Sequence, residues 1–419
     1  MKGLRYLLAV LTQIAGYCIG AIGFVAVFFA SATLMSNPLS FIVVALIVSL
    51  SSLVLLSWLS GSIMKLQRRF HYTLSHFVAG SLLVLVFVSV FLLRPLVPKE
   101  LQTTPTATDG VEYWDLPTGS RIAVRKISGE GGQPRDPVIV LHGGPGSFAV
   151  GLDLTWQSIG ALSEYGHDVY FYDQIGGGLS HRLENIADYS LERHVADLKA
   201  VYSRIGATQV VLIGSSFGAT LAAQYMAEFA DDVSRAVFTA AGPMYLPDWQ
   251  KGEDGTLDAV MSRNEKAAFE AAINKPRLIA AIILADINPE AAERFLPARE
   301  AGAFFDQIAE THYLRHIVCD PSDVDIAMQG FGFWSNRMTG ISLRERTNDP
   351  KPQLRTNHTP VLILRGQCDY KAEAVARQYD DVFPNSRYEI HAGAGHMFYW
   401  DKPALFARTV GVFLQSPRE

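Results

Sequence analysis

The pentapeptide GSSFG at 214–218 offers a serine that could act as a nucleophile. It forms a Gly-x-Ser-x-Gly pattern between an aliphatic run at 209–213 and a helix-like run at 219–229. A sharp strand-to-helix turn exposes the hydroxyl of such a serine, and flanking glycines relieve the crowding in the turn. The pattern therefore predicts Ser216 as a nucleophile and Ser215 as its neighbour.

A serine hydroxyl needs a base to take its proton, and the base needs an acid to orient it. In sites of this kind the chain order is serine, acid, histidine. Asp369 follows a predicted strand at 360–364, and His396 lies in a glycine-rich loop. Open α/β sheets place their sites beyond the C-terminal ends of strands. We therefore expect Asp369 as the acid, with a helix N-cap as its alternative role, and His396 as the base. His391 ends a strand, and we interpret it as structural.

The stretch HGGPG at 142–146 follows another short aliphatic strand, at 137–141. Alone, it fits an ordinary tight turn. Attack by a serine, however, creates an oxyanion that needs two fixed hydrogen-bond donors. We expect the N–H of Phe217, next to the nucleophile, as one donor and the N–H of Gly144 as the other.

The elements around these residues alternate between strands and helices after residue 111. The predicted strands are 111–116, 121–127, 137–141, 168–172, 209–213, 233–239, 360–364 and 387–391. Helices are predicted at 191–205, 219–229, 372–382 and 403–414. Such alternation indicates an α/β domain, here 111–419, with a mostly parallel sheet covered on both faces.

The alternation stops between 245 and 357. Helical patterns follow one another there, at 259–273, 277–286, 289–295 and 301–316. We interpret this insertion as a helical cap over the α/β domain.

The first 98 residues have the composition of a membrane region, because no Asp or Glu occurs before Glu100. Apolar runs at about 6–30, 39–64 and 73–93 are each long enough to cross a bilayer as a helix. The sequence predicts three transmembrane helices, followed by a linker at 99–110. Gly16 and Gly20 allow close helix packing, which we expect inside the bundle.

Basic residues predict the orientation of these helices. They precede the first span and separate the second from the third, as Lys2, Arg5, Lys65, Arg68 and Arg69. The positive-inside rule then puts the N-terminus in the cytoplasm and the α/β domain on the extracytoplasmic side. A signal peptide cleaved near 30–32 is the alternative, and it leaves that domain outside as well. Cys319 and Cys368 would share an oxidising compartment and could pair, although we slightly favour their being unpaired.

The net charge of −5 over 419 residues gives no signature of nucleic-acid binding. No group of residues has metal-ligand spacing, and no nucleotide-phosphate loop is visible. We expect neither a metal nor another cofactor.

Together these motifs resemble the prolyl-iminopeptidase-like group of α/β-hydrolases. HGGPG at 142–146 is that group's hallmark, DQIGGGLS at 173–180 is similar to a second element, and GSSFGATLAAQY at 214–225 is similar to its nucleophile segment. The resemblance covers about 111–242 and 359–414. It implies an α/β-hydrolase with a helical cap that transfers acyl groups through a serine.

The resemblance also implies cap carboxylates that bind the free amino group of a peptide. Glu300, Asp306 and Glu310 have helical spacing and are our candidates for this substrate-binding role, although a solvated helix face explains them equally well. Ile175 replaces an arginine that is usual in the group, and Phe217 stands where tryptophan is common. These departures leave the choice of substrate open.

We therefore expect a membrane-anchored serine hydrolase, and specifically an aminopeptidase that releases N-terminal proline or another small residue from small peptides through an acyl-enzyme. The alternative is an esterase or lipase acting on lipophilic or membrane-derived esters. A non-catalytic receptor or scaffold would have lost a member of the triad, and none is lost. Hydrolases of epoxides or haloalkanes need an aspartate where Ser216 stands.

Overall fold

The computed structural model describes residues 2–107, 109–131, 135–321 and 326–417. It divides into two compact units. One comprises Met1–Pro98 with Ile273–Pro297, and the other comprises Lys99–Ala272 with Ala298–Glu419. We call the first the membrane unit, because three of its helices are long and apolar enough to cross a membrane, and the second the catalytic unit, and we describe each by itself.

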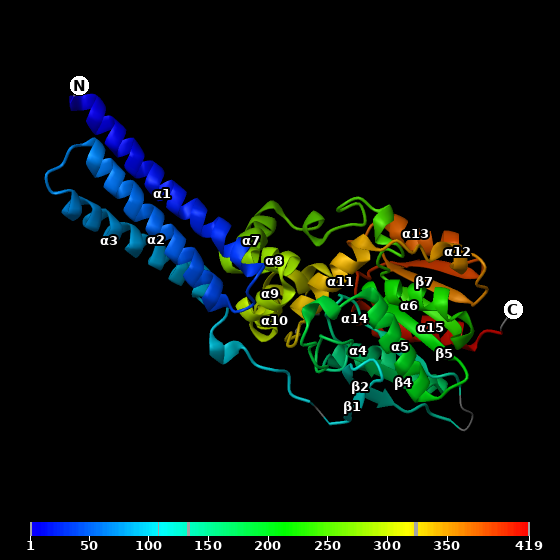
Figure 1. Ribbon diagram of the computed structural model, residues 1–419. Helices are drawn as coiled ribbons and strands as arrows, with labels where there is room; N and C mark the ends of the chain where they lie inside the picture. Colours follow the sequence, from blue (N-terminus) through cyan, green and yellow to red (C-terminus); the bar gives the residue numbers. More distant parts are fainter. Residues whose placement is uncertain (1, 108, 132–134, 322–325, 418–419) are drawn as a thin grey trace. The chain divides into compact units, whose positions relative to one another are not determined.

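The membrane unit is built on three long helices, α1 (Lys2–Ala32), α2 (Pro38–Ile63) and α3 (Arg69–Phe87). Figure 1 shows them in blue, running alongside one another. A π-helical stretch, Val88–Leu93, continues α3. All three helices are long and apolar enough to cross a membrane. The predicted spans agree with them in number and place.

Helix α2 packs against both α1 and α3. A Cβ atom on Gly16 would lie 3.1 Å from Leu56 of α2, and one on Gly20 would lie 3.3 Å from Leu53. The two glycines therefore face α2, and the predicted packing inside the bundle is confirmed.

Two helices from the middle of the chain complete the membrane unit, α8 (Pro276–Ile287) and α9 (Pro289–Phe295). The sequence predicts both helices but assigns them to the cap of the α/β domain. The structure groups them with α1–α3 instead, because their apolar side chains pack there.

The catalytic unit contains an eight-stranded sheet in the order β1-β2-β4-β3-β5-β6-β7-β8. Its strands are β1 (Val111–Asp115), β2 (Arg121–Ile127), β3 (Val138–Leu141), β4 (Val169–Tyr172), β5 (Val210–Ser215), β6 (Val233–Thr239), β7 (Val361–Gly366) and β8 (Ser386–His391). Strand β2 runs antiparallel to both of its neighbours, β1 and β4, and β3 to β8 run parallel to one another. This is the predicted α/β-hydrolase sheet.

Helices cover both faces of the sheet, as the fully buried central strands require. One hydrophobic core includes Leu198 of α5 (Leu191–Ile205), Ala222 of α6 (Phe217–Glu228) and Tyr379 of α13 (Glu373–Val382). The core on the other face includes residues of three further helices. These are α4 (Asp153–Gly160), α14 (Phe398–Asp401) and α15 (Pro403–Gln415).

The helices between β6 and β7 in the catalytic unit include α7 (Arg263–Ile273), α10 (Ala298–Ile308), α11 (Phe333–Glu345) and α12 (Lys351–Leu354). Helix α10 continues as a π-helical turn at Ala309–Tyr313 and a 3-10 turn at Leu314–His316, so the run predicted at 301–316 is helical throughout but changes its type of helix. The sequence reading missed α11, whose buried face includes Ser335 and Thr339 and so shows no continuous apolar stripe.

Candidate active site

Ser216 occupies the one-residue turn between β5 and α6. Its backbone, with φ 54° and ψ −117°, has a conformation that non-glycine residues adopt only under strain. The Ser216 N–H donates to Thr239 O at 3.1 Å, and its carbonyl accepts from Gly242 N at 3.0 Å. A Cβ on Gly218 would lie 2.0 Å from the carbonyl oxygen of Leu141. The turn therefore needs a glycine at position 218, two residues after Ser216, as the motif predicts.

The predicted acid and base lie against each other. Nδ1 of His396 is 2.7 Å from Oδ1 of Asp369, and both side chains are buried. Burial alone would raise the pKa of Asp369, but the neighbouring His396, the hydrogen bonds it accepts and the charge of Arg365 hold that pKa below its ordinary value. An ionised carboxylate only accepts hydrogen bonds, so Nδ1 carries the proton and Nε2 is left to act as a base.

Ser216 and His396 line the same cavity, which has a volume of about 270 Å³. Its walls combine residues from the sheet's C-terminal edge with residues from the cap. The apolar and aromatic lining includes Phe148, Leu152, Ile159, Ile213, Phe269, Phe305, Ile308, Tyr313, Leu314, Ile317, Met328, Phe331, Tyr370, Met397, Tyr399 and Trp400. Among the described residues that line it, none is Asp, Glu, Lys or Arg.

The predicted oxyanion loop is part of the same cavity wall. Gly144, at φ 116°, lines the cavity, and a Cβ on its neighbour Gly143 would lie 3.1 Å from Cβ of Ser216. Phe217 is the first residue of α6, where helix geometry leaves the N–H groups without partners inside the helix. The loop thus stands close to the turn that carries Ser216.

Two buried side chains fix this loop. Nε2 of His142 accepts from Gln174 N at 2.9 Å, while its Nδ1 lies 2.8 Å from Gly143 O. Asp173 accepts the N–H groups of three residues, Ala149, Val150 and Leu179. Gln174 therefore holds the loop at 142–146 through His142, and Asp173 holds the segment that follows this loop.

The three candidate amine-binding carboxylates are not among the residues that line the cavity. Asp306 accepts from Gly330 N and Phe331 N, both at 2.9 Å, and Glu310 accepts from Met328 N at 2.6 Å. Glu300 is buried in α10. Helical spacing puts Asp306 and Glu310 near each other, but both carboxylates hold the loop at 328–331.

Three tyrosines of the cavity were not singled out from the sequence. The ring of Tyr370 lies 4.5 Å from that of His396, centre to centre, and Tyr313 lines the same cavity. The Tyr399 hydroxyl donates to Ser215 Oγ at 3.4 Å. The position of Tyr370 directly after the acid was the available signal.

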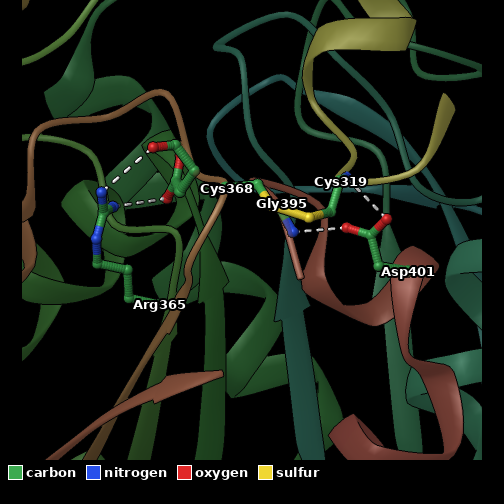
Figure 2. Close-up of a disulfide and its surroundings, with 6 residues drawn as sticks. Cys319, Arg365, Cys368, Gly395 and Asp401 are labelled. Carbon is green, nitrogen blue, oxygen red and sulfur yellow. Dashed lines mark hydrogen bonds and ion pairs between the residues drawn. A yellow bond between two sulfur atoms is a disulfide. The ribbon is translucent and has the colours of Figure 1, made fainter. Parts of the chain in front are cut away.

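A disulfide joins Cys319 to Cys368, the residue before Asp369. Our expectation of unpaired cysteines is therefore wrong; the fold brings their Cα atoms to 5.4 Å although 49 positions separate them. Figure 2 shows Asp401 beside this bond, accepting the N–H of Cys319 at 2.9 Å and of Gly395 at 2.6 Å. The acid loop, the histidine loop and the end of the cap meet here.

Comparisons with known proteins agree with this fold. Residues 136–275 match the family model described as the alpha/beta hydrolase fold. The chain is 24% identical over 306 residues to a proline iminopeptidase of Heyndrickxia coagulans, covering 71% of this chain and 96% of that protein. It is 26% identical over 309 residues to one of Lactobacillus delbrueckii subsp. bulgaricus, covering 72% and 97%.

Among solved structures, VinJ has the same fold, with a TM-score of 0.50 and 20% identity over 74% of this chain and 99% of VinJ. The fold, the serine motif and the relatives agree with one another. The chain is therefore a serine hydrolase of the α/β-hydrolase fold that is similar to proline iminopeptidases.

Proposed function

We propose that this protein hydrolyses esters of apolar acyl groups through an acyl-enzyme on Ser216. The observation that carries the proposal is the cavity beside Ser216, whose described lining is apolar and aromatic with no Asp, Glu, Lys or Arg. An apolar acyl chain gains free energy when it leaves water for such a cavity.

The proposed reaction uses Ser216, His396 and Gly144, which line the cavity, together with Asp369 and Phe217, which adjoin them. Oγ of Ser216 attacks the ester carbonyl carbon while Nε2 of His396 takes the hydroxyl proton, and Asp369 holds the resulting imidazolium. The N–H groups of Gly144 and Phe217 donate to the oxyanion. His396 then protonates the departing alcohol, and the acyl group stays on Ser216. Water activated by His396 releases the acid and restores the serine.

An aminopeptidase is the second candidate, because the relatives described above are named proline iminopeptidases. A free N-terminal amine is charged, and burying it without a carboxylate partner is unfavourable. Asp306 and Glu310 do not line the cavity and instead accept hydrogen bonds from backbone N–H groups of the loop at 328–331, which favours the ester over the peptide.

We also propose that the protein is anchored in a membrane by α1–α3, with the catalytic unit on the extracytoplasmic side. Three observations support this proposal: the length and apolar composition of the helices, the basic residues near the ends of α1 and α2, and the Cys319–Cys368 disulfide. Disulfides persist in oxidising compartments and are rare in the cytosol. A reporter fused after Glu419 tests the orientation. If a reporter that works only in the cytoplasm were active in this fusion, the proposed orientation would be contradicted.

A substrate panel tests the choice between ester and peptide. Purified full-length protein would receive p-nitrophenyl esters of increasing acyl length, a prolyl-arylamide with a free amine, and the same arylamide with its amine blocked. We expect the longer esters to have the highest kcat/KM, and blocking the amine to leave turnover unchanged. A strong preference for the free amine would replace the ester proposal with the aminopeptidase. Ser216→Ala supplies the background rate.

A further inference from the structure

Helix α8 exposes an apolar ridge. Ile279, Ile283 and Ile287 follow one another at intervals of four residues, so they lie on one face of the helix. Their side chains are 42%, 40% and 38% exposed. The eight residues between Arg277 and Asp286 are all apolar. A helix that is this apolar on its exposed side needs a partner other than water.

The opposite side of α8 is buried inside the membrane unit. Leu278, Ala281 and Leu284 are almost fully buried there. Arg277 lies at the start of α8, and its guanidinium donates to the carbonyl oxygens of Arg94 at 3.3 Å and Phe295 at 2.8 Å. The helix is therefore fixed beside the point where the chain leaves the third span.

The connection between α8 and α9 is fixed to the same end of the other two spans. Nδ2 of Asn288 donates to the carbonyl of Ala32, the last residue of α1, at 2.9 Å. Ser36, in the turn before α2, donates to Glu290 at 2.7 Å. The ring of Phe295 lies 5.7 Å from that of Phe28, centre to centre. The α8–α9 pair thus packs where all three spans end.

We propose that α8 lies in the interfacial region of the lipid leaflet at that end of the spans, with Ile279, Ile283 and Ile287 in contact with lipid. The occupant is lipid because the ridge belongs to a unit whose other large exposed apolar side chains lie on α1–α3 and the segments that connect or continue them, and these helices are long and apolar enough to cross a membrane. An in-plane helix with one apolar face is the form in which non-spanning segments bind this region. The proposal rests on the membrane anchoring proposed above.

This placement has a consequence for substrate, which rests on the proposed esterase function. The chain runs from α9 directly into α10, and α10 carries Phe305 and Ile308, which line the cavity. Two residues of the cavity lining are therefore connected along the chain, through α9, to a helix that we place in the lipid interface. The substrate class that suits such a cap is an ester dissolved in the leaflet.

Site-specific fluorescence tests the lipid contact without using activity. In a Cys18→Ala background, which removes the single free cysteine of the described chain, Ile283→Cys would carry an environment-sensitive fluorophore in full-length protein in liposomes. The matched control is Ile390→Cys, an apolar residue of β8 that is 47% exposed. We expect lipids with a nitroxide near the headgroup to quench most of the fluorescence at 283, and aqueous iodide to quench the control.

Quenching at 283 by iodide and not by nitroxide lipids would overturn the proposal, since the ridge would then face water. Protection from both quenchers would overturn it as well, because a protein would then cover the ridge. A second variant tests the consequence for substrate. Replacing all three isoleucines with serine should lower turnover of a long-chain ester in liposomes and leave turnover of a water-soluble short ester unchanged. If the triple variant lowered turnover of both esters equally, the inference about the substrate would be wrong. The lipid contact of α8 would be unaffected by that result, because the fluorescence measurement does not depend on activity.

Discussion

Cys368 directly precedes Asp369, and its sulfur is bonded to that of Cys319. The N–H of Cys319 donates to Asp401, which also accepts the N–H of Gly395, next to His396. The N–H of Cys368 donates to the carbonyl of Ala394. One covalent bond and one carboxylate therefore connect the acid loop and the histidine loop to the end of the cap.

Removing the disulfide should weaken both stability and turnover. The bond closes a loop with a sequence separation of 49 residues, for which chain entropy gives a stabilisation of about 4 kcal/mol. We expect Cys319→Ser/Cys368→Ser to lower the free energy of unfolding by about 2–4 kcal/mol, and to lower kcat more than it changes KM. Thermal unfolding and ester kinetics measure these effects. Cys18→Ser is the matched control, and a double variant that matches it in both measurements would contradict the prediction.

The oxyanion loop gives a second prediction. Gly144 has φ 116°, and a Cβ there would lie 2.7 Å from Ser147 N. Gly144→Ala must therefore shift the loop, and loss of one oxyanion donor lowers kcat by about 10²–10³-fold. Gly151→Ala is the control, because a Cβ at Gly151 meets no atom within 4 Å. Steady-state ester kinetics check this, and a Gly144→Ala variant with the kcat of the control would exclude Gly144 as a donor.

A third prediction concerns the proposed catalytic residues Ser216, Asp369 and His396. Ser216→Ala and His396→Ala should each remove nearly all turnover, and Asp369→Asn should lower kcat by about 10⁴-fold, since the imidazole then loses its orienting carboxylate. His391→Ala serves as the control, because His391 stacks on Phe398 and is not among the cavity residues. Labelling by a fluorophosphonate reports the serine directly. Equal labelling of wild type and Ser216→Ala would exclude Ser216 as the nucleophile.

The sequence was most informative where function depends on local chain geometry. Ser216, its flanking glycines and the loop at 142–146 are specified by neighbours in the chain, so their pattern indicates both turn and chemistry. The strands were also predictable, most directly β3, β5 and β7, which contain continuous aliphatic runs. In the sheet, β4 lies between β2 and β3, although β3 comes first in the chain. This exchange depends on long-range packing, and no local sequence pattern encodes it.

The remaining features depend on contacts that spacing cannot reveal. Helical spacing at Asp306 and Glu310 shows that they share a region of the cap, but not that backbone N–H groups of the loop at 328–331 occupy both carboxylates. The buried face of α11 contains Ser335 and Thr339, which hides its apolar side. The grouping of α8 and α9 with α1–α3 likewise follows from tertiary packing.

The hydrogen bonds of Asp306 lead to a fourth prediction. Burial raises the pKa of Asp306, and its two backbone hydrogen bonds hold Gly330 and Phe331 in place. Asp306→Asn should cost about 1–3 kcal/mol of stability, because an amide group offers one acceptor oxygen where the carboxylate offers two. Under the ester proposal, the kcat/KM of the Asp306→Asn variant for a short ester should stay near that of the wild type. A loss of tenfold or more confined to the free-amine arylamide would instead assign Asp306 to amine binding.

The lowered pKa of Asp369 sets the direction of a pH effect on stability. An aspartate in the unfolded chain titrates near its ordinary value of 3.8, and in the folded protein His396 and Arg365 hold the pKa of Asp369 below that value. Below pH 3.8 the unfolded chain therefore binds this proton before the folded protein does. The stability that ionised Asp369 contributes is fully present above the ordinary value, and it is lost as pH falls through the lowered, folded pKa.

Asp369→Asn removes this titration and should flatten the acid limb of the stability curve. Thermal unfolding from neutral pH down through pH 3.8 would show the difference between wild type and variant shrinking as the acid range is entered. Asp168 is a suitable control, because its pKa is also lowered, by Lys126 and by the N–H of Gly129, far from the catalytic residues in the sequence. Asp168→Asn should leave the Asp369 contribution intact. Parallel curves for wild type and Asp369→Asn over the whole range would show that the pKa of Asp369 is not lowered in the folded protein.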